Sequence, residues 1–391
     1  MTQASRRPAP RVAIATRLFA PEVGAAAFRL RVLADAFGAA GCAVEVVTTR
    51  PPAGSAPITD GALSVSRWPA LRDENGIIRG YLQYLSFDVP LVLRLLARRA
   101  PDLYVSEPPP TTGFVVRVVA MLRRRPYAYY APDIWSEAAG SAGAPAFLVR
   151  GLRAVESWVM RGACIVLAVS DEVAARVEAL GVAPDRITVV GNGIDTEVFA
   201  PDGPVRERDA PYVVYTGTMS EWQGAGVFLE GLALHRARGH RTTAVFLGQG
   251  TDLPHLRQVA EDALPGAVSF LGVQPPAVAA EWLRGAAAAL VSIKPGLGYD
   301  FAKPTKVYAA TACGTPVLFA GSGATRDLVR DNALGWAVEY APGAVADALE
   351  EAVIGDRPLG GSRLVAWTRA NASLRAAADS AVRRVLEAIG R

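Results

Sequence analysis

Residues 12–48 read VAIATRLFAPEVGAAAFRLRVLADAFGAAGCAVEVVT. The apolar run 12–16 predicts a buried strand that ends in a loop. Residues 28–40 place apolar side chains at helical spacing before Gly41, and residues 44–48 predict a second strand. A strand, a helix and a strand in this order form one β-α-β unit, in which the two strands are parallel.

The same alternation continues along the chain, and a polar segment at 204–211 divides it into two series. Further strands are predicted at 103–106, 128–130, 165–170 and 187–190, and then at 212–216, 244–247, 268–271, 288–293 and 316–319. Such alternation predicts parallel sheets that are covered on both faces. We therefore expect an α/β protein with two doubly wound, Rossmann-like domains, at 1–200 and 201–365. Residues 366–391 are expected to form a C-terminal helix that packs back toward the N-terminal domain.

Ligands of doubly wound sheets bind where the carboxyl ends of strands meet loops and helix N-termini. Gly248-Gln-Gly250 follows one predicted strand, but it lacks the third glycine of a dinucleotide-binding fingerprint. We interpret it as a tight turn. An NAD-dependent oxidoreductase is therefore the weaker alternative for this fold class.

Composition excludes several classes of protein. The chain has 391 residues, too many for one ordinary core, and 51% of them are hydrophobic. The net charge of +4 comes without a basic tail, so no nucleic-acid partner is expected. Three cysteines indicate reduced thiols, three histidines lack metal-ligand spacing, and residues 1–11 lack the apolar core of a signal peptide. We expect a cytoplasmic protein without a bound metal.

The sequence supports association with a membrane only weakly. Residues 91–100 end in Arg98-Arg99, and residues 114–122 run into Arg123-Arg124-Arg125. Either segment could lie on an anionic bilayer, or it could pack on a sheet with its arginines near the negative end of a helix. The oligomeric state is left open.

Only three of the 41 Lys and Arg residues are lysines, and all three lie within residues 294–306. This window is a Gly/Pro loop followed by a helix start, with Lys303 at the expected N-cap and Pro304 at the first helical position. A helix N-terminus with ammonium groups beside it is an anion site, and lysine is a good partner for phosphate. The alternative is that Lys294, Lys303 and Lys306 are surface residues of a loop.

Motifs in both predicted domains resemble those of the family 4 retaining glycosyltransferases, whose fold is GT-B. They lie at residues 19–26, 131–137, 170–172, 190–195, 217–224, 270–273 and 304–317. Segment 131–137, APDIWSE, is similar to a family segment found in enzymes that act on amino-sugar and lipid-linked acceptors. Segment 217–224, GTMSEWQG, is similar to the loop that binds the donor phosphates. The resemblance implies an acceptor-binding N-terminal domain, a nucleotide-sugar-binding C-terminal domain and a cleft between them.

The resemblance and the lysine window together imply a set of site residues. Catalytic roles are predicted for Lys306, Asp133 and Lys294. Donor binding is predicted for Gly24, Gly217, Thr218, Gln223, Gly272, Val273, Lys303, Thr305 and Lys306. Acceptor binding is predicted for Glu107, Asp133 and Trp135. No metal ligand is predicted.

The chain departs from the family pattern in two motifs. Family members usually carry a pair of glutamates where this chain has Phe301 and Ala309, and the second of them holds the donor ribose. The phosphate loop commonly has Arg and Lys where this chain has Thr218 and Gln223. Part of the grip on the donor must therefore come from other residues, and the lysines are the natural substitute.

The implied function is metal-independent transfer of a sugar, with retention, from a nucleoside-diphosphate donor of the UDP or GDP type. The donor is a co-substrate, and no cofactor is expected. The expected acceptor is a small soluble molecule, as in antibiotic or other specialised-metabolite biosynthesis. One alternative is transfer to a polyprenyl-linked sugar at the inner membrane face, in cell-surface polysaccharide synthesis. Another is a GT-B protein that binds a nucleotide-sugar without catalysis.

Overall fold

The computed structural model describes residues 9–22, 24–52, 55, 59–73, 76, 78, 80–141, 143–354 and 361–391. The chain forms two compact units. Unit 1 comprises Met1–Asn192 and Leu374–Arg391, and unit 2 comprises Gly193–Ser373. The division after Asn192 lies eight residues before the expected boundary, and the chain returns to unit 1 at Leu374 rather than at residue 366.

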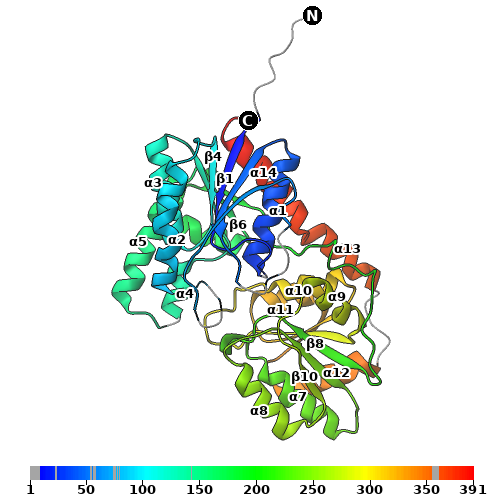
Figure 1. Ribbon diagram of the computed structural model, residues 1–391. Coiled ribbons are helices and arrows are strands. Elements are labelled where there is room, and N and C mark those ends of the chain that lie inside the picture. Colours follow the sequence, from blue (N-terminus) through cyan, green and yellow to red (C-terminus); the bar gives the residue numbers. More distant parts are fainter. Residues whose placement is uncertain are drawn as a thin grey trace, which may run out of the picture. The chain divides into compact units, whose positions relative to one another are not determined.

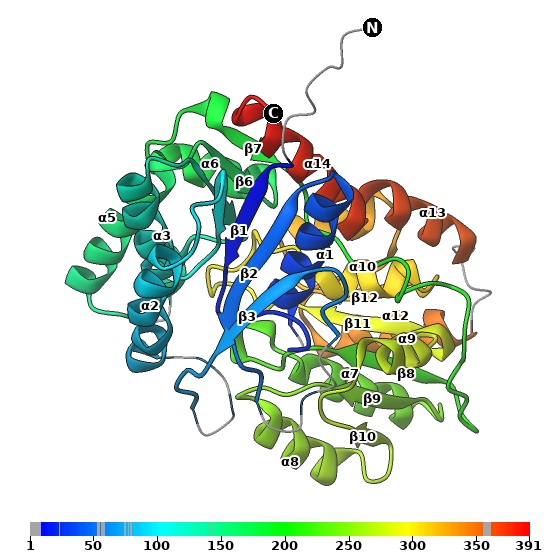
Figure 2. The same ribbon diagram turned by 45° about the horizontal axis from the view of Figure 1, so that its top comes forward.

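Unit 1 is built on a seven-stranded parallel sheet with the order β3-β2-β1-β4-β5-β6-β7. Its strands are β1 Arg11–Ala15, β2 Ala43–Thr49, β3 Ser64–Trp68, β4 Leu103–Ser106, β5 Tyr127–Ala131, β6 Ile165–Ala168 and β7 Ile187–Val189. Figure 2 shows β1, β2 and β3 side by side, with β3 at the edge. The central strands β4, β5 and β6 are buried along their whole length, as expected of parallel strands covered on both faces.

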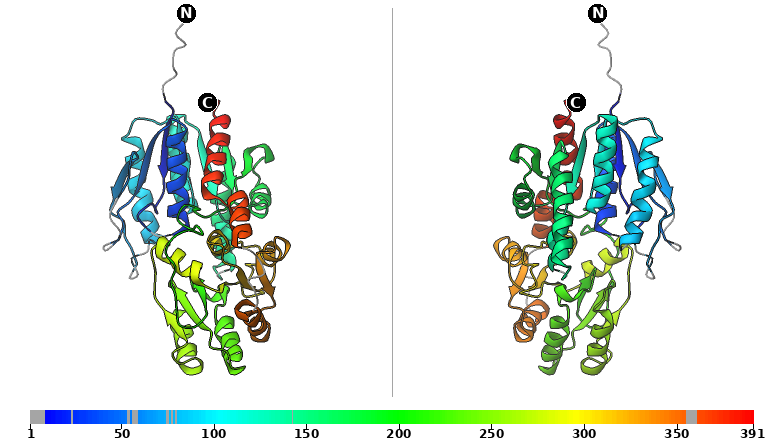
Figure 3. Two further views of the ribbon diagram at one scale, coloured as in Figure 1. Left: turned by 90° about the vertical axis from the view of Figure 1, so that its right-hand side faces the viewer. Right: turned by 90° about the vertical axis from the view of Figure 1, so that its left-hand side faces the viewer.

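Helices cover both faces of this sheet. They are α1 Ala25–Ala39, α2 Tyr81–Leu96, α3 Pro110–Arg123, α4 Trp135–Ser141, α5 Ala146–Gly162, α6 Asp171–Ala179 and α14 Leu374–Ala388. One core forms where α2, α3, α5 and α6 pack on the sheet, and a second forms under α1 and α14. Figure 1 labels these layers, and Figure 3 shows them from opposite sides.

Unit 2 repeats the design with a six-stranded parallel sheet of order β10-β9-β8-β11-β12-β13. Its strands are β8 Tyr212–Thr216, β9 Thr243–Leu247, β10 Val268–Phe270, β11 Ala288–Ser292, β12 Val317–Ala320 and β13 Gly335–Val338. Its helices are α7 Gly226–Ala237, α8 Leu253–Ala263, α9 Pro276–Gly285, α10 Thr305–Ala312, α11 Ala324–Asp331, α12 Pro342–Ile354 and α13 Gly361–Asn371. One core lies under α7, α8 and α12, and the other under α9, α10 and α13. The prediction of two doubly wound α/β domains is confirmed.

The structure differs from the sequence prediction in three elements. The edge strands β3 and β13 were not predicted; both are short and only partly buried, and polar residues alternate with apolar ones in β3. The single helix predicted at the C-terminal end is two helices, α13 and α14, separated at Ala372-Ser373. Its apolar spacing continues across the break because each half packs on a core, Leu364 in unit 2 and Val382 in unit 1.

Gly231 allows α7 and α12 to pack closely. A Cβ atom added to Gly231 would lie 2.7 Å from Val345 Cβ and 3.1 Å from the Pro342 carbonyl oxygen. Those atoms belong to α12 and are themselves held in a packed core. The two helices therefore could not keep their separation around a larger residue.

We expect Gly231→Ala to lower the free energy of unfolding by about 1–3 kcal/mol, the usual range for overpacking. Gly151→Ala is the matched control, since Gly151 lies within α5 and an added Cβ would meet nothing within 4 Å. It should gain up to about 1 kcal/mol from helix propensity alone. Urea unfolding followed by circular dichroism measures both, and equal stability of the two variants would contradict the packing argument.

Candidate functional site

Each sheet reverses its winding direction between two central strands. The reversal lies between β1 and β4 in unit 1 and between β8 and β11 in unit 2. The loops that leave such a pair of strands diverge to opposite faces, and ligands of open α/β sheets bind in the crevice between them. The predicted residues Glu107, Gly217 and Lys294 each follow one of these four strands directly or within two residues.

Lys306 carries a buried charged group in unit 2. Its Nζ atom is buried and has no hydrogen-bond partner among the described residues. It lies 3.8 Å from the centroid of the Tyr215 ring, close enough for a cation–π contact. Burial lowers the pKa of the Lys306 ammonium to about 7. A buried ammonium that has no counter-ion among the described residues favours the binding of an anion.

Gly217, directly after β8, lies beside the Lys306 side chain. Gly217 has a φ of 106°, in a region that residues with a side chain rarely adopt. A Cβ atom at this position would lie 3.6 Å from Lys306 Cε. The Gly217 N–H donates to the Leu247 carbonyl, and the Gly248 N–H to that of Gly272. The exits of β8, β9 and β10 are thus tied together, with Val273 half exposed beyond them.

The predicted phosphate loop is stabilised by its own side chains. Gln223 is buried, and its Oε1 atom accepts hydrogen bonds from Thr218 Oγ1 at 3.1 Å and from Ser220 N and Oγ at 3.2 Å. Ser220 and Gln223 form a capping box on the short 3-10 helix Glu221–Gln223. Gln223 therefore shapes the loop, whereas Thr218 is exposed at its start. Their donor-binding roles stay predictions.

The lysine window is anchored at both ends. The Lys294 N–H donates to the Trp222 carbonyl at 2.8 Å, and the Trp222 ring stacks on Tyr299 at 4.5 Å. Asp300 Oδ1 accepts from Ser322 Oγ at 2.7 Å. These contacts connect the window to the phosphate loop and to the start of α11. The Lys294 side chain is exposed, and that of Lys303 is partly exposed.

The start of α10 lies one residue later than predicted. Pro304 is the N-cap, with extended backbone angles, and Thr305 is the first helical residue. Lys303 therefore precedes the cap, because the fixed φ of proline suits either position and only its ψ decides between them. Thr305 lies in the first turn beside Lys306, where N–H groups lack helical partners. Ala309, one turn further, is only 5% exposed.

In unit 1, Glu107 lies at the carboxyl end of β4 and is buried. Its Oε2 atom accepts from Arg29 Nη2 at 2.8 Å, and its Oε1 atom accepts from Thr16 Oγ1 at 3.1 Å. Arg29 is buried on α1, and Gly24 is the N-cap of that helix. Glu107 is thus satisfied within the protein, which makes it a group that positions the β1 and β4 loops.

Asp133 lies two residues after β5 and is exposed to solvent. Surrounding protein atoms displace much of its water, and this desolvation raises the pKa of the Asp133 carboxyl to about 6. Arg29 opposes the shift by its positive charge. The carboxylate is therefore both accessible and weakly basic near neutral pH, which suits a partner for a sugar hydroxyl.

Trp135 begins α4, and a buried carboxylate fixes the start of that helix. Glu156 accepts from the Trp135 N–H at 2.7 Å, and from the Ser136 N–H at 3.0 Å and Oγ at 2.6 Å. The Trp135 ring lies edge-on to Tyr84, with centroids 5.8 Å apart. Its partly exposed ring is thus held in one orientation.

Sequence reasoning missed Arg17 and Asp88, which lie in the same part of unit 1. The Arg17 guanidinium lies 4.3 Å from the Tyr84 ring centroid, and its buried Nε has no hydrogen-bond partner. Asp88 Oδ1 accepts from Thr112 Oγ1 at 2.6 Å, while its Oδ2 is buried without a partner. One signal was available: Asp88 is the sole acidic residue of α2.

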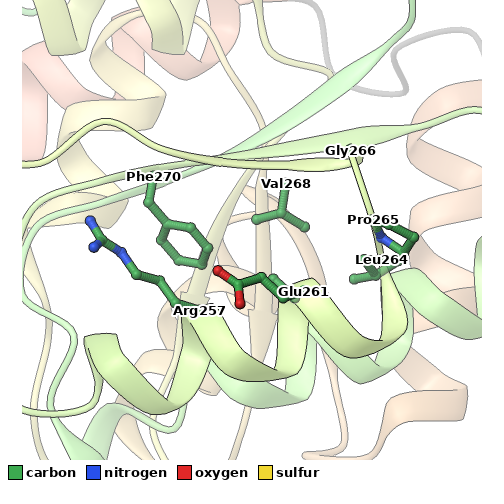
Figure 4. Close-up of a pocket in the computed structure, with 8 residues that line it drawn as sticks. Arg257, Glu261, Leu264, Pro265, Gly266, Val268 and Phe270 are labelled. Carbon is green, nitrogen blue, oxygen red and sulfur yellow. The ribbon is translucent and has the colours of Figure 1, made fainter.

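A surface pocket of unit 2 lies apart from these residues. It has a volume of about 500 Å³ between α8 and β10 (Figure 4). Its lining residues are Arg257, Ala260, Glu261, Leu264, Pro265, Gly266, Val268 and Phe270. None of the predicted site residues lines it. Within the described residues, no cluster of three His, Cys, Asp or Glu side chains could hold a metal ion.

Two family models match the chain in succession. Residues 24–193 match the glycosyl transferase 4-like domain, and residues 210–354 match the glycosyl transferases group 1 domain. The chain therefore belongs to the glycosyltransferases with the GT-B fold, and within them to family 4. No helix in the described ranges combines the length and apolar character that crossing a bilayer requires.

Comparison with individual proteins gives matches over part of the chain. The chain is 31% identical over 191 residues to the D-inositol 3-phosphate glycosyltransferase of Acidothermus cellulolyticus. It is 29% identical over 172 residues to the GDP-mannose-dependent alpha-(1-6)-phosphatidylinositol monomannoside mannosyltransferase of Mycolicibacterium smegmatis. These matches cover 44% and 41% of this chain, and 42% and 44% of the relatives' own lengths. Among solved structures, Anabaena HepE in complex with UDP and glucose has a TM-score of 0.69 and 16% identity, over 97% of this chain and 99% of that one.

The burial of Lys306 predicts a pH-dependent loss of stability. In the unfolded chain this lysine titrates near 10.5, so between about pH 7 and pH 10 the unfolded state binds more protons than the folded state. Stability therefore rises with pH across that window. We expect Lys306→Met to raise the free energy of unfolding near pH 7 by about 1–3 kcal/mol, with the gain shrinking toward pH 10.

Chemical denaturation at several pH values measures this difference. Lys294→Met is the matched control, because Lys294 is exposed and its replacement should change stability little at any pH. A Lys306→Met variant that is less stable than the wild type at pH 7 would show that burial of the ammonium does not destabilise the folded protein.

Proposed function

We propose that the chain transfers a sugar from a nucleoside-diphosphate donor to a hydroxyl of an acceptor, with retention at the anomeric carbon. The observation that carries the proposal is Lys306, whose buried ammonium lies beside the loop that leaves β8 and has no counter-ion among the described residues. Family membership supports the reaction class. The structural neighbour HepE was solved in complex with UDP and glucose. Unit 2 is the proposed donor-binding unit and unit 1 the acceptor-binding unit.

In the proposed mechanism, Lys306 binds the diphosphate of the donor. Negative charge grows on the β-phosphate as the glycosidic bond breaks, and a fixed cation stabilises that charge more in the transition state than in the ground state. The N-terminus of α10 adds N–H groups to the same region. Lys294, Lys303 and Thr305 are proposed to contact the same phosphates from the loop. The departing phosphate oxygen takes the acceptor proton, so no side-chain base is required.

Acceptor binding is proposed for the carboxyl edge of the unit 1 sheet. Asp133 is placed to accept a hydrogen bond from a hydroxyl, and the Trp135 ring offers a face for a sugar or polyol. Arg17 Nε and Asp88 Oδ2 are a buried donor and a buried acceptor that lack partners among the described residues. A polar ligand that reached these two groups would satisfy them.

The acceptor itself has two candidates. The sequence favours a small soluble acceptor, and one relative is named for D-inositol 3-phosphate. The second candidate is a lipid-linked acceptor, and another relative is named for a phosphatidylinositol monomannoside. The second candidate is favoured by the exposed apolar side chains of α2 and by the exposed arginines that follow α2 and α3 in unit 1. Product analysis by mass spectrometry, with a soluble and a lipid-linked acceptor offered together, separates them.

The proposed phosphate role of Lys306 is tested by nucleotide binding. We expect UDP or GDP, in a thermal-shift screen that also includes dTDP, to stabilise the wild type, because a ligand of the folded state raises its melting temperature. Lys306→Ala should lose about 1.5–3 kcal/mol of affinity by calorimetry, and Lys306→Arg should not restore it. Binding near pH 8 should take up as much as one proton, because the phosphate charge raises the pKa of Lys306 again.

Arg369→Ala is the control for this experiment, since Arg369 is an exposed residue of α13. Unchanged affinity in a folded Lys306→Ala variant would remove the lysine from the site. Binding of nucleotide without turnover of any nucleotide-sugar, measured as release of the diphosphate, would instead support a non-catalytic binding protein.

Ala309→Glu tests why the usual ribose carboxylate is absent. The new side chain would lie one helical turn after Lys306, on the same face of α10, in a position that is almost fully buried. It would neutralise the ammonium and occupy the space proposed for the donor. We expect nucleotide affinity to fall about tenfold or more, and less in Ala309→Gln, which adds the same volume without charge. A gain in affinity for Ala309→Glu would indicate an ordinary ribose site that lacks one contact.

A further inference from the structure

Helix α2 exposes a stripe of large apolar side chains. Tyr81, Leu85, Val89 and Leu93 follow one another at intervals of four residues, so they lie on one face of the helix. They are 71%, 50%, 63% and 69% exposed, and Leu82 beside them is 70% exposed. Single exposed apolar residues are normal, but a row of them along a whole helix marks an interaction surface.

The stripe is not the side of α2 that packs on the sheet. Phe87, Leu91 and Leu95 fill that role and are at most 2% exposed. Helix α3 is the neighbour of α2 in the same layer (Figure 1), and it exposes Met121 and Leu122 at 61% and 67%. Both neighbouring helices therefore expose large apolar side chains.

This helix layer is also basic. The acidic residues of α2, α3 and α5 are Asp88 and Glu156, and both are buried. Exposed arginines follow or belong to the same helices, namely Arg99, Arg124, Arg150, Arg153 and Arg161. Helices that connect parallel strands run in the same direction, so the arginines near their C-terminal ends gather at one edge of the layer.

We propose that the α2–α3–α5 layer of unit 1 docks on the surface of an anionic lipid bilayer. The apolar stripe enters the boundary between headgroups and acyl chains, and the arginines bind anionic headgroups. A surface with exposed arginines and no exposed acid on its helices fits a negatively charged partner. A second copy of this chain fits poorly, since it would bring two positive faces together.

The proposal does not depend on the donor site, because none of its residues is assigned to nucleotide binding. Vesicle flotation tests it with the full chain and vesicles of phosphatidylcholine, with or without phosphatidylglycerol. We expect binding only when phosphatidylglycerol is present, and weaker binding as salt concentration rises. Removal of the apolar stripe by Leu85→Ser, Val89→Ser and Leu93→Ser together should lower binding at least about tenfold.

Charge is tested separately by Arg99→Gln with Arg161→Gln, since Arg99 follows α2 and Arg161 lies in the last turn of α5. Near an anionic surface each arginine contributes about fivefold, so the pair should lose about thirtyfold. The matched control carries Leu234→Ser and Arg369→Gln, which change an exposed leucine and an exposed arginine of unit 2. All variants should keep the melting temperature and the nucleotide affinity of the wild type, since each site is exposed.

Three outcomes would overturn the proposal. The first is absence of the wild type from floated anionic vesicles at low salt. The second is equal loss of vesicle binding in the control variant. The third is a dimer in light scattering that the triple serine variant dissociates, with vesicle binding unchanged, because that result would assign the stripe to self-association.

Discussion

The crossover between two central strands governs where charged groups are buried in both units. Parallel strands end at the same edge of a sheet, and the loops diverge where the winding direction reverses. In unit 1 this edge gathers Arg17, Arg29 and Glu107 from segments far apart in the sequence. In unit 2 it brings Lys306 under the loop that leaves β8. The same topology thus builds a carboxylate and guanidinium network in one unit and an isolated ammonium in the other.

The buried charged groups differ in whether a protein partner satisfies them. Glu107 and Arg29 form an ion pair at 2.8 Å, although Arg29 Nε has no partner among the described residues. Lys306 Nζ, Arg17 Nε and Asp88 Oδ2 are buried without hydrogen-bond partners among the described residues. Each such group reduces stability, and the apolar cores on both faces of each sheet must offset the loss. A bound ligand with complementary charge would satisfy groups of this kind.

The sheet architecture could be predicted because buried parallel strands appear in the sequence as short apolar runs that are followed by glycine turns. The sequence also singled out Lys306 and Glu107 as candidates, since they stand at a helix start and a strand exit, and their roles stay predictions. It did not predict β3, in which serine and arginine interrupt the apolar residues, or the short edge strand β13. Arg17 was hidden among many other arginines, and its contact with Tyr84 joins residues 67 positions apart. The outward apolar stripe of α2 was missed because an apolar residue in a helix predicts burial, and only the packed helix shows which face is covered.

A compact ammonium group suits the position of Lys306 in this arginine-rich chain. Its Nζ atom lies 3.8 Å from the centroid of the Tyr215 ring, beside Gly217. It can also release its proton when it is buried, whereas a guanidinium stays charged at any physiological pH. With a pKa near 7, Lys306 is neutral in part of the molecules when no anion is present. The empty site then avoids some of the free energy of burying a charge, and an arriving diphosphate restores the positive charge at the atom that it contacts.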